Sequence, residues 1–168
     1  MVFGMTTYTF VHVLISLAGI VSGFVVLYGL LSANRMNGWT LFFLATTVAT
    51  SVTGFGFAFH GVTPAIILGV VSLIVLAVAI AARYVFRLNG AWSGIYAGAA
   101  VAALYFNVFV LVVQSFLKVP ALHALAPKGS EPPFAIAQGA VLVAFLVLGF
   151  LAVKRFRAGA ASLTAAVA

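Results

Sequence analysis

Apolar residues fill five long stretches of this sequence, and most of the polar and charged residues lie in the segments between them. A helix rises about 1.5 Å per residue and needs about 20 residues to cross a hydrocarbon core of about 30 Å. Each stretch is close to that length and contains no acidic residue, so each predicts a membrane-spanning helix. The five predicted spans cover about residues 10–31, 40–59, 65–85, 92–117 and 134–153.

The connections between the spans determine the expected arrangement. Three of the four are short, which makes consecutive spans antiparallel neighbours. The long one contains the apolar segment 119–125, which predicts a short helix at the membrane surface, and it ends at Pro133 in the first turn of the last span. The sequence therefore predicts an all-α fold, a polytopic membrane helical bundle in one domain over residues 1–157. A disordered tail is expected over residues 158–168.

The basic residues indicate an orientation. One side of the predicted bundle holds only Lys118 and Lys128, together with Glu131, the single acidic residue of the chain. Cytoplasmic loops carry an excess of Lys and Arg, so the more basic side is expected inside, with the N-terminus outside and the C-terminus inside. The residues on that basic side, at the inner ends of the first, third and fifth spans or just after them, are Arg35, Arg83, Arg87, Lys154, Arg155 and Arg157.

The composition, 65% hydrophobic and 5% charged, argues against several classes of function. One acidic residue, outside the spans, cannot support a carrier built on buried carboxylates or a Ser-His-Asp hydrolase. The chain has no cysteine, hence no thiolate metal ligand, and it has no glycine-rich phosphate loop. The net charge of +7 is spread over several span ends and forms no basic patch, so nucleic acid is not an expected partner. No catalytic motif is present, which favours a non-catalytic protein.

Polar side chains inside the spans are the candidate functional residues, because an unpaired polar group in hydrocarbon is costly. With the N-terminus outside, these side chains and the three histidines gather in the outer half of the bundle. The candidate ligand-binding residues are Asn107, Gln114, Lys118, Glu131 and Gln138, and the conditional metal ligands are His12, His60 and His123.

Three interpretations of this outer cluster stay open. In the first, Gln114 pairs with Gln138, or Asn107 with a threonine, across helices at about 0.6 kcal/mol for each pair, and the histidines lie at the water interface. In the second, His12 and His60 are axial ligands of a haem b, or the three histidines and Glu131 hold zinc or copper. In the third, a small polar cavity binds a quinone or a lipid head group, with Lys118 as the anchor for an anion.

Small and aromatic residues predict how the helices pack. Gly19 and Gly23 in the first span, and Gly94 and Gly98 in the fourth, have the four-residue spacing that lets helix backbones approach closely. The aromatic residues Trp39, Tyr84, Trp92 and Tyr96 are expected at the inner membrane interface, where amphipathic rings prefer to lie.

Several segments also carry a resemblance. They are Thr53-Gly54-Phe55, Thr63-Pro64, Ala82-Arg83-Tyr84, Gly90-Ala91-Trp92, Ile95-Tyr96, Leu104-Tyr-Phe-Asn-Val-Phe-Val110, Gln114-Ser-Phe-Leu-Lys-Val-Pro-Ala-Leu122 and Ser130-Glu-Pro-Pro-Phe134 with Gln138. Over roughly two thirds of its length the chain resembles an uncharacterised family of small bacterial polytopic membrane proteins. The resemblance implies a bacterial inner-membrane location and transfers no reaction, ligand or site residue.

The resulting expectation is a non-catalytic component or accessory subunit of the inner membrane with a polar cluster or ligand pocket on its outer face. Its partners are the lipid bilayer and other membrane subunits, or further copies in a homo-oligomer. The alternative is a haem b- or metal-binding redox protein that uses the outer histidines.

Overall fold

Threonine side chains cap the first turns of two helices in this protein. The computed structural model describes residues 6–57 and 63–165. The Thr6 side chain accepts a hydrogen bond from the amide of Thr9 and so caps the helix that begins at Thr7. The Thr63 side chain caps the helix that begins at Pro64 in the same way, by accepting from the amide of Ile66, and Pro64 suits the first turn of that helix. The elements are α1 (Thr7–Leu31), α2 (Asn37–Gly54), α3 (Pro64–Ile80), the π-helical turn η1 (Ala81–Val85), α4 (Trp92–Lys118), α5 (Pro120–Leu125) and α6 (Pro132–Ala165).

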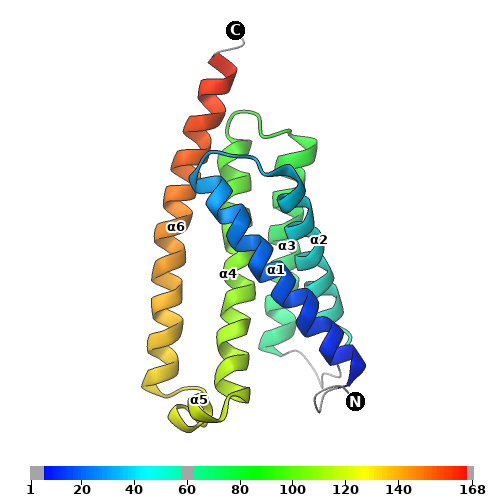
Figure 1. Ribbon diagram of the computed structural model, residues 1–168, viewed down its shortest axis with the longest axis vertical. Helices are drawn as coiled ribbons and strands as arrows, with labels where there is room; N and C mark the ends of the chain where they lie inside the picture. The colour runs from blue at the N-terminus through cyan, green and yellow to red at the C-terminus, as the bar shows by residue number, and fades with distance from the viewer. Residues whose placement is uncertain (1–5, 58–62, 166–168) are drawn as a thin grey trace.

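The long helices run side by side in alternating directions and form an elongated bundle (Figure 1). Helix α4 lies at its centre and packs against α1, α3 and α6, while α2 packs between α1 and α3. Helix α6 lies at one edge and contacts α4 and, less extensively, α1. The core consequently forms where α1, α2, α3 and α4 meet, and the largest apolar side chains buried there are Phe43, Leu30, Leu76 and Leu104.

Four helical segments of the described residues are long and apolar enough to cross a membrane, namely Thr7–Leu31, Pro64–Val85, Trp92–Lys118 and Pro132–Gly159. This is the pattern of a multi-pass membrane protein. The fifth span predicted from the sequence, at α2, is not among these segments, because α2 is only 18 residues long and is rich in threonine. Its residues Phe43, Thr40 and Thr47 are nevertheless buried within the bundle.

Helix α5 agrees with the sequence prediction, and the end of α6 differs from it. Helix α5 (Pro120–Leu125) confirms the short helix expected after the fourth long helix. Helix α6 continues to Ala165, although the sequence favours a disordered tail from Ala158 onward. Alanine has the highest helix propensity, and extending an existing helix requires no new nucleus, so this alanine-rich segment continues the helix.

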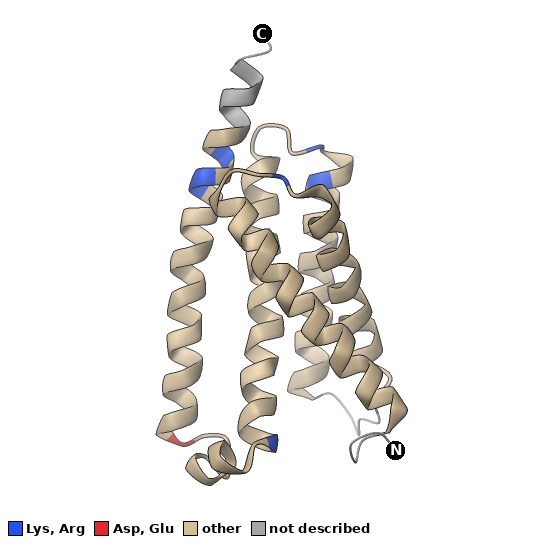
Figure 2. Cartoon of the chain, in the orientation of Figure 1, with Lys and Arg blue, Asp and Glu red and all other residues tan. Residues whose placement is uncertain are grey.

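Charge is unevenly distributed between the two ends of the bundle (Figure 2). Helix α4 ends at Lys118 and Glu131 precedes α6, both at the end where α1 begins. The opposite end, called the cationic end below, holds Arg35, Arg83, Arg87, Lys154, Arg155 and Arg157.

Candidate functional site

His12 lies at the contact between α1 and α2. Its Nδ1 atom is 2.8 Å from Thr53 Oγ1, and its ring packs edge-on against Phe57 with 5.0 Å between ring centres. The Tyr8 hydroxyl, one turn earlier on α1, donates a hydrogen bond to the carbonyl oxygen of Thr53. Together these contacts join the first turns of α1 to the last turns of α2.

Asn107 and Gln138 also make contacts between helices. Asn107 Nδ2 of α4 donates to Thr47 Oγ1 of α2 over 3.3 Å, which is the asparagine–threonine pair that the first interpretation expects. Gln138 Nε2 of α6 donates to the carbonyl oxygen of Phe109 in α4 over 3.2 Å, and its buried Oε1 atom has no hydrogen-bond partner among the residues that the structure describes. Gln114 is exposed, and within the described part of the chain it forms no hydrogen bond with Gln138, so the other pair offered by that interpretation is not formed.

Glu131 bonds to its own loop. Its Oε1 atom accepts from the Lys128 amide and its Oε2 atom from the Ser130 amide, each at 3.0 Å. These backbone hydrogen bonds, the Lys128 amide first, favour the charged form and lower the pKa of the Glu131 carboxyl. Lys118 is exposed, and within residues 6–57 and 63–165 it forms no ion pair with Glu131.

The described histidines lie on different elements. His12 is in the first turns of α1, whereas His123 is exposed in α5, which packs against α4 on the other side of this end of the bundle (Figure 1). His60 lies outside the described residues. In the part of the chain that the structure describes, no three His, Cys, Asp or Glu side chains come together as metal ligands would. The structure thus does not gather His12, His123 and Glu131 into one site.

The structure reveals a polar network at the cationic end that sequence reasoning missed. Arg83 of η1 is only 7% exposed, and its Nη2 atom donates to the Arg35 carbonyl oxygen at 2.9 Å and to Asn37 Oδ1 at 2.7 Å. The guanidinium carbon lies 5.0 Å from the centre of the Tyr96 ring and 5.8 Å from that of Tyr84, close enough for cation–π attraction.

The position of the Tyr96 side chain differs from the sequence prediction, which placed this ring at the inner membrane interface. The side chain is 1% exposed and faces the interior of the bundle instead of the lipid, because its position on α4 faces η1 and Phe156 of α6. Its hydroxyl donates to Thr40 Oγ1 over 3.2 Å, and Thr40 Oγ1 donates in turn to the Arg35 carbonyl oxygen. We call the group formed by Arg83, the Arg35 carbonyl, Asn37, Thr40 and Tyr96 the arginine network.

The sequence contained one signal for this network. Arg83 is followed by the apolar residues Val85 and Phe86, so it lies one turn inside its hydrophobic run and not at the end of it. An arginine at that depth must bond to protein groups or reach back to the interface.

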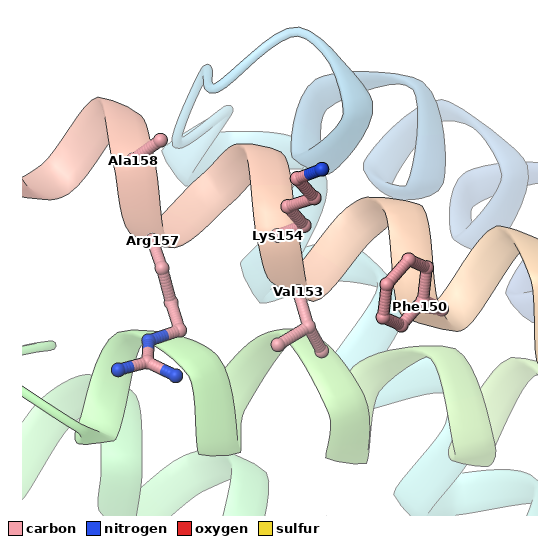
Figure 3. Close-up of a pocket in the computed structure, with 5 residues that line it drawn as sticks. All are labelled: Phe150, Val153, Lys154, Arg157 and Ala158. Atoms are coloured by element: carbon pink, nitrogen blue, oxygen red, sulfur yellow. The ribbon is translucent and has the colours of Figure 1, made fainter.

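A groove lined by residues of α6, on the part of this helix next to α4, is the second feature of the cationic end. It has a volume of about 440 Å³ and is lined by Phe150, Val153, Lys154, Arg157 and Ala158 (Figure 3). Val153 and Arg157 point toward α4, and Lys154 points away from it. The Arg157 side chain lies over Gly94, where an added methyl group would be 2.5 Å from its Cδ atom.

These features place apolar walls and cationic groups next to each other, which suits an anionic amphiphile better than a neutral polar ligand. Comparison of the chain with protein-family models, curated protein sequences and solved structures finds no match.

Proposed function

We propose that the protein is a non-catalytic component of a bacterial inner membrane that binds an anionic phospholipid in the groove on α6 next to α4. One observation carries this proposal. Lys154 and Arg157 line the same groove as Phe150 and Val153, at the end of the bundle that holds most of the basic residues. The polar contacts away from the cationic end support a non-catalytic role, because His12, Asn107 and Gln138 all bond neighbouring helices.

The same proposal includes five membrane crossings, with α2 as the second. Helices α1 and α3 run in the same direction, and α2 lies between them in the reverse direction with Phe43 and Thr47 buried. A crossing by α2 puts the Arg35 loop and the Arg87 loop on one side of the membrane. The excess of basic residues places that side in the cytoplasm, with the N-terminus outside. The resemblance to small bacterial membrane proteins supports the inner membrane as the location.

The chemistry of the groove matches the two parts of a phospholipid. A phosphate group accepts hydrogen bonds from Arg157, and the Lys154 ammonium on the other side of α6 adds positive charge near it. The acyl chains extend along the exposed apolar face of α6, which includes Leu146, Val147 and Phe150. Anionic lipids of the cytoplasmic leaflet attract basic residues near the membrane surface by about 1 kcal/mol for each Lys or Arg.

Native mass spectrometry of detergent-purified protein with added phosphatidylglycerol or phosphatidylcholine tests the proposal. The parent should retain phosphatidylglycerol in preference to phosphatidylcholine. The double variant Lys154→Gln/Arg157→Gln should bind phosphatidylglycerol roughly tenfold or more weakly, because two contributions of about 1 kcal/mol are lost. The matched control, Lys118→Gln/Lys128→Gln, removes the same charge at the opposite end and should bind like the parent. Equal losses in the two double variants, or no preference in the parent, would refute the groove as the lipid site.

A further inference from the structure

Arg83 is a buried positive charge without an internal counter-ion. The chain has one acidic residue, Glu131, and its two carboxylate oxygens accept hydrogen bonds from the amides of Lys128 and Ser130 at the other end of the bundle. Removing a charge from water is costly unless an opposite charge or a full set of hydrogen bonds replaces the lost hydration. No side-chain carboxylate of this chain supplies that charge to Arg83.

Neutral groups satisfy the guanidinium only in part. The Arg35 carbonyl oxygen and Asn37 Oδ1 both accept from Nη2, and the Tyr96 and Tyr84 rings face the cation. Nη1 is buried and has no hydrogen-bond partner among the described residues. Its two N–H groups are therefore unsatisfied, on a side chain that keeps its charge when buried.

We propose that Arg83 is the centre of an oxyanion site that takes a phosphate group from outside the chain. A planar guanidinium binds phosphate through parallel N–H groups, and Nη1 is the nitrogen left for such a bond. Arg35 and Arg87, exposed in the loops beside Arg83, add positive charge around this position. The phosphate belongs either to an inner-leaflet phospholipid or to free inorganic phosphate. This site is separate from the α6 groove, which is built from other residues.

Entry of the anion requires a local movement that can be measured. Nη1 is covered by protein, and the Arg35 loop is held to the guanidinium through the Arg35 carbonyl and Asn37. Binding at Nη1 should shift this loop and η1. Trp92 reports on that region because it stacks on Phe86, just after η1, with 3.7 Å between ring centres and 4° between ring planes. In a Trp39→Phe protein, Trp92 is the only remaining tryptophan.

The test is a titration of Trp39→Phe protein in neutral detergent, with Trp92 fluorescence and thermal unfolding as readouts. Inorganic phosphate is one probe, phosphatidylglycerol in mixed micelles is the second, and sodium chloride at matched ionic strength is the control. We expect saturable changes with phosphate, or with phosphatidylglycerol alone if the head group is the source, and none with chloride. The variant Arg83→Gln should lose the response, and Arg83→Lys, which keeps the charge but lacks the fork of donors, should bind about tenfold more weakly.

Further variants distinguish loss of the Arg83 site from loss of the groove and from misfolding. Lys154→Gln/Arg157→Gln alters the groove and leaves Arg83 intact, so it should retain the Trp92 response to phosphate even if it loses lipid binding in the groove. If Arg83→Gln does not fold, Arg83→Lys still tests the site, and Lys118→Gln, which removes one positive charge at the opposite end of the bundle, serves as the control and should respond like the parent. An undiminished response in the Arg83 variants, or a parent that responds to neither phosphate nor phosphatidylglycerol, would overturn the proposal.

Discussion

Asn107 of α4 and Thr47 of α2 are joined by a 3.3 Å hydrogen bond near the middle of both helices. Gly19 of α1 faces the same point, where an added methyl group would lie 3.4 Å from Thr47 Oγ1 and 3.5 Å from Asn107 Nδ2. Three helices therefore meet around one polar pair, and the absence of a side chain on α1 lets them approach.

A double-mutant cycle should measure the Asn107–Thr47 bond. Asn107→Ala, Thr47→Ala and the combined variant should give a coupling of about 0.6 kcal/mol in detergent unfolding, the usual size for such pairs in membrane proteins. Thr46→Ala is the control partner, because Thr46 Oγ1 donates to the carbonyls of Phe42 and Phe43 in its own helix. Equal coupling of Asn107 to Thr46 and Thr47 would contradict the assigned contact.

Gly23 and Gly19 should respond differently to the same substitution. A methyl group on Gly23 would lie 2.5 Å from Leu104 Cδ1 and 2.9 Å from Phe43 Cε2, two side chains that are almost completely buried. We expect Gly23→Ala to lower the free energy of unfolding by about 1–2 kcal/mol through overpacking. Gly19→Ala meets its neighbours at 3.4 Å and should be close to neutral. Thermal unfolding of both variants measures the difference. A Gly19→Ala variant that is less stable than Gly23→Ala would contradict the tighter packing assigned to Gly23.

The titration of Glu131 should be displaced to low pH. The pKa of its carboxyl is lowered in the folded loop, chiefly by the Lys128 amide. The charged carboxylate therefore stabilises the loop above its unfolded pKa, and this stabilisation is lost as the pH falls through the lower folded value. Glu131 is the only Asp or Glu, so selective ¹³C labelling of glutamate gives a single NMR signal to follow. Lys118→Gln should leave the curve unchanged, and a pKa that rises in this variant would reveal an ion pair.

Cysteine accessibility can test the crossing by α2, because the chain has no cysteine of its own. Asn34→Cys and Asn89→Cys lie in the loops after α1 and after η1, and Ser130→Cys lies in the loop before α6. Five crossings with the cationic end inside predict that a membrane-impermeant maleimide labels only Ser130→Cys in intact cells. If α2 does not cross, Asn34→Cys and Asn89→Cys fall on opposite sides, and one of them becomes accessible from outside.

The amino-acid sequence alone determined the elements of this protein. Apolar runs of the length of a membrane core predicted the long helices, and Pro133 lies in the first turn of α6 as expected. The asparagine–threonine pair was also anticipated, because a polar residue in the middle of an apolar helix has few alternatives to a polar neighbour. These features depend on local propensity and on hydropathy summed along the chain, both of which can be read without knowing which helices touch.

Tertiary structure decided which side chains share a site. Arg83 was counted among the basic residues of the inner side and Tyr96 was assigned to the membrane interface, yet both side chains are buried in one network with the Arg35 carbonyl. Glu131 bonds to the Lys128 and Ser130 amides instead of Lys118, because the turn of its own loop presents two N–H groups to it. Such choices depend on how each helix is rotated about its axis and which neighbour it faces. A sequence whose helices are apolar on nearly every side contains little information on that rotation.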